Sequence, residues 1–186
     1  EYHDPLNAGH PDWGTLVFNF ERNEVVSFVE GGLTYLSLSR STLDWGIPVP
    51  GAPDHVMYVW VDALTNYITG VGFPDEADAR WRYWPADLHL IGKDILTTHA
   101  VYWPTMLMAA GLELPRSILA HGWWTFGEQK MSKSKGNVVK PLDTMDLFGR
   151  DILRYFLMRE MTPGSDSNFS QELIVERNNA ELANDI

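Results

Sequence analysis

Strand-like and helix-like apolar patterns alternate through the middle of this 186-residue chain. Short runs rich in aliphatic and aromatic residues predict strands at His55–Trp60, Asp87–Ile91 and Ser117–His121. Between them, Asp62–Thr69 and Ile95–Ala110 have the length and periodicity of helices. Strands that alternate with helices are typical of an α/β fold built on a mostly parallel sheet.

The N-terminal part precedes this alternating pattern. Arg22–Glu30 predicts a short helix that ends at Gly31, and Leu33–Ser39 predicts a strand with leucines on one face. The turn-rich stretch Gly46–Pro53 predicts a stiff connection and a domain boundary. Residues 1–20 show no clear periodicity and stay unassigned.

Helical patterns dominate the C-terminal part. Pro141–Phe148 and Asp151–Met161 predict two helices. Ser170 is expected to cap a third helix, with Glu172 in its first turn. That last pattern is still helical where the sequence stops at Ile186.

Polar and aromatic residues gather where the predicted strands end. Trp60 and Asp62 follow the first strand, Gly92–Asp94 follow the second, and His121–Trp124 follow the third. Ligands of open parallel sheets bind beyond the carboxyl ends of the strands. These three groups therefore predict a ligand pocket at one edge of the sheet.

Composition excludes several classes of function. The formal net charge of −11 argues against a protein that coats nucleic acid in general. The absence of cysteine excludes disulfides, thiol catalysis and cysteine-ligated zinc within this chain. The longest apolar run, Ala100–Leu112, is too short to span a bilayer, and we find no signal peptide. The absence of cysteine is compatible with a cytoplasmic location, and we expect no membrane partner.

A lysine-rich loop stands out against this acidic background. Lys130, Lys133 and Lys135 alternate with Ser132 and Ser134 in a stretch bounded by glycines. Ammonium and hydroxyl donors in a loop that can close over a ligand suit a polyphosphate. Judged by charge alone, a solvated turn or a nuclear-localisation-like run accounts for it as well.

Two stripes of apolar and aromatic residues have helical spacing. The first occupies positions i, i+3, i+4 and i+7 of one predicted helix, and the second occupies i, i+4 and i+8 of the next. The residues are Trp60, Ala63, Leu64, Tyr67, Ile95, His99 and Trp103. Each stripe alone is more typical of core than of a site. A histidine between an aliphatic and an indole also suits a small amphipathic ligand.

The order of residues in the lysine loop carries a resemblance to a known family. Lys130–Ser134, followed by a further lysine, glycine and asparagine, resembles the signature loop of class I aminoacyl-tRNA synthetases. Other strings, in family order, resemble bacterial methionyl-tRNA synthetases. They are Asp44–Gly51, Val59–Tyr67, His89–Ile95 and His99–Pro104. The joint match is specific, because other class I synthetases share the loop but not these strings.

The resemblance implies a domain organisation. Residues 1–53 would be the end of a connective insertion, with 1–20 unassigned. Residues 54–168 would be the second half of a Rossmann-like catalytic domain with the lysine loop, and 169–186 the start of an all-helical anticodon-binding domain. The family's other signature, His-Ile-Gly-His or a close variant, does not occur in this sequence. We therefore expect an interior fragment that is inactive alone.

The implied activity is that of a methionine–tRNA ligase. ATP and L-methionine would give methionyl-adenylate, which then reacts with tRNA(Met); Mg²⁺ would enter with ATP, and no metal site is expected in this chain. Lys130 and Lys133 would be catalytic. ATP would be bound by Lys130, Met131, Ser132, Lys133, Ser134, Gly92 and Asp94. Asp94 resembles a residue that holds the ribose hydroxyls, and a helix N-cap accounts for it equally well.

The two stripes would line the methionine pocket, where aromatic rings pack well against a thioether. One methylene discriminates between ligands by only about 1–3 kcal/mol, so we expect a polar contact near sulfur from His99 or Tyr67. Thr98 and Leu64 stand where the family often has an aromatic residue and a proline. These two departures change the expected pocket shape.

Two other functions compete with this interpretation. One is a non-catalytic synthetase-like module that binds nucleotide or tRNA, which the missing second signature favours. The other is a class I synthetase for leucine, isoleucine or valine, against which the two stripes argue.

Overall fold

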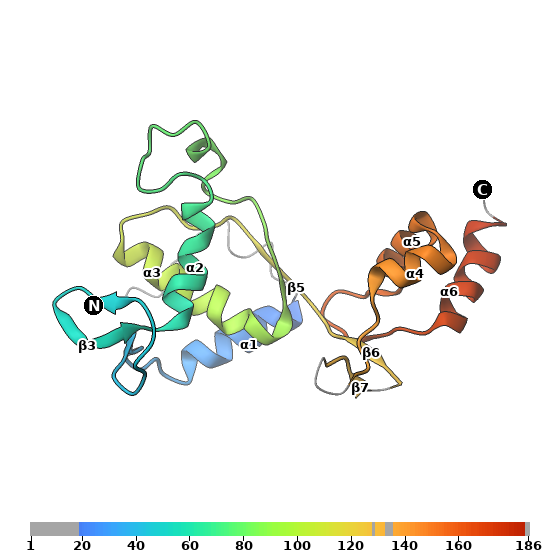
Figure 1. Ribbon diagram of the computed structural model, residues 1–186, viewed down its shortest axis with the longest axis horizontal. Helices are drawn as coiled ribbons and strands as arrows, with labels where there is room; N and C mark the ends of the chain where they lie inside the picture. The colour runs from blue at the N-terminus through green and yellow to red at the C-terminus, as the bar shows by residue number, and fades with distance from the viewer. Residues whose placement is uncertain (1–18, 128, 133–135, 185–186) are drawn as a thin grey trace. The chain divides into compact units, whose positions relative to one another are not determined.

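The computed structural model describes residues 19–127, 129–132 and 136–184 (Figure 1). The chain groups into two compact units, Glu1–His89 with Ile95–Ile118 and Leu90–Asp94 with Leu119–Ile186. It passes between them inside β4 (His89–Gly92) and β5 (Ile118–His121), which pair with each other. Each unit has its own hydrophobic core.

The first unit holds a small sheet and the helices around it. Its elements are α1 (Asn19–Glu30), β1 (Ser39–Arg40), β2 (Pro48–Val49), β3 (Ala52–Met57), α2 (Val59–Thr69), η1 (Trp81–Tyr83), the π-helical η3 (Thr98–Tyr102) and α3 (Trp103–Ala109). β3 pairs antiparallel with β1 on one side and β2 on the other.

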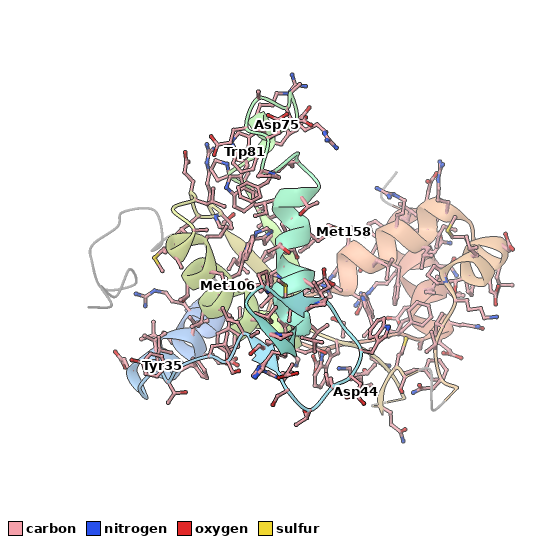
Figure 2. All side chains as sticks on the ribbon, turned by 60° about the vertical axis from the view of Figure 1, so that its left-hand side comes forward. Tyr35, Asp44, Asp75, Trp81, Met106 and Met158 are labelled. Carbon is pink, nitrogen blue, oxygen red and sulfur yellow. The ribbon has the colours of Figure 1, made fainter. Side chains whose placement is uncertain are left out.

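The N-terminal predictions are partly wrong. The helix at Arg22–Glu30 is confirmed within α1, but the strand at Leu33–Ser39 is wrong, because only Ser39 and Arg40 pair. β3 is too short to reach further back, and Tyr35, which Figure 2 shows beside α1, is fully exposed. Alternating leucines do not make a strand unless a partner edge lies alongside.

The stretch Gly46–Pro53 is a hairpin rather than a stiff connection. β2 and β3 flank a turn in which Gly51 has φ +79°, a conformation that favours glycine. The strand predicted at His55–Trp60 therefore begins earlier, at Ala52, and it ends at Met57 because α2 begins two residues later. The domain boundary near residue 53 stays a prediction.

Helix α2 contributes two buried residues to the core of the first unit. It begins at Val59 behind Tyr58, without a side-chain cap, so the predicted start at Asp62 is wrong and Asp62 lies in the first turn. Leu64 and Ile68 are buried. They pack with Trp84, Trp103 and Leu107 in the core of the first unit. The loop beyond the C-terminal end of α2 carries Asp75 and Trp81 (Figure 2).

The predicted helix at Ile95–Ala110 is present but not uniform. A 3₁₀ turn, η2 (Lys93–Ile95), leads into the π-helical η3 and then α3, which ends before Gly111 at φ +70°. The backbone N–H of Trp103 bonds to Thr98 O, five residues back. Pro104 follows directly, in the first turn of α3.

The second unit is built from a small sheet and a helical layer. Its further elements are β6 (Trp124–Phe126), β7 (Gln129–Lys130), α4 (Pro141–Phe148), α5 (Arg150–Glu160), β8 (Ser167–Asn168), α6 (Gln171–Arg177) and the π-helical η5 (Asn178–Leu182). α4 and α5 lie side by side (Figure 1). The buried core residues are Leu153, Phe156, Phe169 and Ile174.

The C-terminal helix predictions are confirmed, except that helical structure within the described residues ends at Leu182 instead of continuing toward Ile186. The bounds of α4 are those predicted, and α5 is shifted by one residue toward the N-terminus. Ser170 is the N-cap of α6, where its Oγ accepts from the backbone N–H of Leu173 at 3.1 Å, and Glu172 lies in the first turn.

The α/β class is confirmed, but the mostly parallel sheet is not what the described strands form. They make three small sheets, ordered β1-β3-β2, β4-β5 and β7-β6-β8. β6 pairs antiparallel with β7 and parallel with β8. Hairpins account for the antiparallel pairs β2–β3 and β6–β7, because short turns bring consecutive strands back on themselves, whereas β1 pairs with β3 across the intervening β2. None of the helices in the described part of the chain has the length and apolar character needed to cross a membrane.

Candidate functional site

A cluster of charged groups in the second unit surrounds one indole ring. We call it the Trp123 cluster; its members are Lys93, Asp94, Trp123, Lys130 and Asp166. Lys130 Nζ lies 2.8 Å from Asp94 Oδ2, and the indole Nε1–H of Trp123 donates to Asp94 Oδ1 at 2.6 Å. Lys93 Nζ lies 2.6 Å from Asp166 Oδ1. The cluster thus joins the end of β4, the start of β6 and the end of β7.

These contacts stabilise the charged form of both carboxylates. Hydrogen bonds from Lys130 and Trp123 lower the pKa of Asp94 to about 2. The pKa of Asp166 is lowered mainly by the hydrogen bond from Lys93 and then by the backbone N–H of Trp123. The side chain of Asp94 binds Lys130 and Trp123, and its two alternative roles, at the ribose or as a helix cap, stay predictions.

The side chain of Asn137 binds the backbone at the start of the lysine loop. Its Oδ1 accepts from the backbone N–H of Ser132 at 2.7 Å, and its Nδ2 donates to the carbonyl of Lys130 at 3.3 Å. Met131 packs against the core of the second unit. The loop therefore starts from a fixed strand end. The predicted site residues Lys133 and Ser134 lie outside the described residues.

Gly92 lies beside Asp94 and His121, where a Cβ would make only ordinary van der Waals contacts. A Cβ added there would lie 3.5 Å from Asp94 Oδ1 and 3.9 Å from His121 Cε1. The predicted groups Gly92–Asp94 and His121–Trp124 therefore meet, as expected of strand ends on one edge. The group at Trp60 and Asp62 belongs to the other unit.

Aromatic rings and two histidines form a second cluster, inside the first unit. Tyr67 Oη and His99 Nε2 are 2.9 Å apart, and His99 Nδ1 lies 2.9 Å from the carbonyl oxygen of Ile95. A carbonyl only accepts, so Nδ1 carries the hydrogen and Nε2 accepts from the Tyr67 hydroxyl. Trp60 meets His99 edge to face, with ring centroids 6.2 Å apart. The two polar groups predicted to face sulfur thus bind each other.

His89 is the member of this cluster that sequence reasoning missed. It is 4% exposed, its ring centroid lies 4.3 Å from that of Tyr67, and its Nε2 accepts from Trp103 Nε1 at 3.3 Å. A signal existed: His89 shares the inward face of a predicted strand with Ile91, and both are buried. A lone histidine in an apolar strand is easily read as core.

The seven residues predicted for the methionine pocket divide by burial. Leu64, His99 and Trp103 are almost fully buried, which also fits the core interpretation. Trp60, Tyr67 and Ile95 are partly buried, and Ala63 is exposed. The structure brings the aromatic residues and His99 together and leaves Ala63 at the surface.

Burial keeps both histidines neutral at neutral pH. Desolvation, followed by the nearby His99, lowers the pKa of His89 to about 4, and desolvation also lowers the pKa of His99. The pKa of Tyr67 is raised by burial. An uncharged, ring-lined site is suited to an apolar side chain.

His89 is expected to make the protein acid-sensitive. Between about pH 6.5 and 4 the unfolded chain binds a proton at His89 that the folded chain does not, so stability is full above pH 6.5 and falls with pH. His89→Gln retains an acceptor for Trp103 and removes the titration. By pH 5 we expect the free energy of unfolding of the parent to have fallen by on the order of 2 kcal/mol more than that of the variant. Urea unfolding from pH 7.5 to 5 measures this; parallel stability curves would contradict it.

Comparisons with known proteins show the family to which the chain belongs. The family model for class I (M) tRNA synthetases matches residues 15–186, and the chain belongs to this family. The chain is similar to curated methionine–tRNA ligases, with 61% identity over 165 residues for Brucella suis biovar 1 and 60% over 189 residues for Mycobacterium tuberculosis H37Rv. These alignments cover 89% and 100% of this chain but 32% and 36% of the relatives. The chain spans about a third of their length.

Solved structures show the same likeness. Mycobacterium tuberculosis methionyl-tRNA synthetase in complex with methionyl-adenylate matches with a TM-score of 0.87 and 56% identity, covering 96% of this chain and 36% of that chain. The apo form of that protein matches with a TM-score of 0.79 and 53% identity, over 94% of this chain and 33% of that one. The predicted resemblance is therefore confirmed, while the roles of single residues stay predictions. The described residues contain no group of three or more histidine, aspartate or glutamate side chains placed to hold a metal ion.

Proposed function

We propose that the protein carrying this chain is a methionine–tRNA ligase. The observation that carries the proposal is the 0.87 TM-score match, over 96% of the chain, to a synthetase whose structure holds methionyl-adenylate. Two groups of residues support it. The Trp123 cluster offers lysines to phosphates, and the cluster of rings around Tyr67 and His99 offers an apolar side chain a place to pack. A role in translation would place the protein in the cytoplasm.

The proposed reaction has two steps. A carboxylate oxygen of methionine attacks the α-phosphorus of ATP, and the bond to pyrophosphate breaks. A hydroxyl of the terminal ribose of tRNA(Met) then attacks the acyl carbon, and AMP leaves. No protein nucleophile is required, so the protein acts by positioning and by charge stabilisation. Mg²⁺ would arrive with ATP.

Lys130 and Lys133 are proposed to stabilise the charge on the phosphates as pyrophosphate leaves. Met131, Ser132 and Ser134 complete the loop, and Gly92 lies directly beside Asp94. Asp94 is proposed to accept from the ribose hydroxyls. Its two bound donors do not prevent this, because a carboxylate has about four lone-pair sites.

The methionine side chain is proposed to lie against Trp60, Tyr67 and His99, with Ile95, Leu64, Trp103 and Ala63 around it. Since the Tyr67 hydroxyl hydrogen is used on His99, selection would rest on shape and on thioether–ring contact rather than on a free donor. The domain limits 1–53, 54–168 and 169–186 belong to the same proposal.

Aminoacylation tests the proposal directly. The purified protein that carries this chain should attach radiolabelled methionine to tRNA(Met) when ATP is present. A protein that binds ATP or tRNA but forms no methionyl-tRNA would support the non-catalytic module instead.

The 186-residue chain alone is expected to give no methionine-dependent exchange of pyrophosphate into ATP. It carries the lysine loop but no string like the family's other signature, so the phosphates would be stabilised from one side only. It also exposes an apolar groove of about 1100 Å³ between residues 33–38 and α3, which should bind a hydrophobic dye. Exchange by the isolated chain at the rate of the longer protein would contradict this prediction.

A further inference from the structure

We infer that Trp123 is a positioning residue that holds Lys130, the first lysine of the loop, at the edge of the nucleotide site. The inference rests on the proposed function and adds to it a residue that does not belong to the proposed ATP or methionine set. Trp123 lies between β5 and β6, directly before the strand that leads into the loop hairpin.

The Trp123 ring receives two cations. Lys130 Nζ lies 3.9 Å from the ring centroid, and Lys93 Nζ lies 4.4 Å from it. Both distances are well inside the range of cation–π attraction, for which tryptophan is the best partner. The ring therefore holds the ammonium group of Lys130 in place without neutralising it.

Trp123 also binds the two carboxylates that pair with these lysines. Its Nε1–H donates to Asp94 at 2.6 Å, and its backbone N–H donates to Asp166 Oδ1 at 2.8 Å. Each aspartate is thus held by one lysine and by one N–H group of Trp123. Removing the indole would take one contact from Asp94 and one from Lys130. The ion pair of these two residues, which lie 36 residues apart in the sequence, would then lose its support from Trp123.

A purely structural role fits the neighbouring residue better. The Trp124 ring packs against Phe156 and Phe169 in the core, with centroids 5.8 and 6.2 Å away. In the described part of the chain, the ring contacts found for Trp123 are with lysines. Its side chain is half-buried, and Lys130 and Asp94 are about half exposed. Trp123 therefore faces the site rather than the core.

Two variants of the protein that carries this chain separate the two functions of the indole. Trp123→Leu removes the ring face and the N–H donor, whereas Trp123→Phe retains a ring face. We expect Trp123→Leu to raise the KM for ATP and slow adenylate formation, each by about tenfold, with the methionine KM unchanged and Trp123→Phe intermediate. Trp124→Phe is the matched control for a packing defect and should change only the folded fraction.

Rates are measured by pyrophosphate exchange per active site, counted by burst titration. An unchanged ATP KM and rate for Trp123→Leu, or a loss of folded protein alone as in the control, would overturn the inference. If the parent shows no exchange, the proposed function fails and direct ATP binding becomes the test. Trp123→Leu should then weaken ATP binding about tenfold; equal affinity, or no ATP binding by the parent, overturns the inference.

Discussion

Lys133→Ala is expected to slow methionyl-adenylate formation by about a hundredfold or more, roughly 3 kcal/mol for one lost transition-state contact. Lys133 is the second lysine of the signature loop. In the proposed reaction its positive charge stabilises the negative charge that develops on pyrophosphate as it leaves. Because methionine lies in the other proposed cluster, its KM should barely change. The loss should appear in the rate at saturating substrate rather than in binding.

Single-turnover formation of the adenylate measures this effect. Lys140→Ala is the matched control: it removes the same charge seven residues later, from an exposed residue directly before α4. The control should keep the parent rate. Equal exchange rates for Lys133→Ala and the parent would remove the loop from the proposed mechanism.

His99→Ala is expected to raise the KM for methionine by about tenfold to a hundredfold. The change removes a ring between Trp60 and Tyr67 and leaves the partly buried Tyr67 hydroxyl without its acceptor. Discrimination against other apolar amino acids should weaken as well, because the wall of the pocket becomes less defined. Trp60→Ala should act in the same direction.

Tyr67→Phe is the control that separates the hydrogen bond from the ring. It removes the same bond to His99 and retains an aromatic wall, so its effect on the methionine KM should be smaller. The rate and KM of each variant are calculated for the folded fraction of the protein. If His99→Ala and Trp60→Ala merely lower thermal stability, with unchanged constants for the folded protein, these residues are core.

Local signals in the sequence predicted the helices of the second unit well. Pro141 fixes the first turn of α4, and Gly149 at φ +93° ends it, while Ser170 caps α6 through its own side chain. These features act within a few residues of one another, and a sequence displays them directly. The predicted strand at Leu33–Ser39 failed because a strand depends on a partner that local pattern does not reveal.

The candidate site was predictable only where residues follow a short-range pattern. Tyr67 and His99 were expected on helical faces, and the structure joins them. The bonds of Asp94 to Lys130 and Trp123 span 36 and 29 residues, and no spacing rule indicates them. His89 was missed because its neighbours in space, Tyr67 and Trp103, are distant in sequence.

Exchange of pyrophosphate into ATP, measured with each standard amino acid in turn, tests the central claim most directly. The purified protein that carries this chain should support exchange with methionine and with no other amino acid at a comparable rate. Exchange that depends on leucine, isoleucine or valine would show a synthetase of another specificity. The absence of exchange with every amino acid would contradict the ligase proposal altogether.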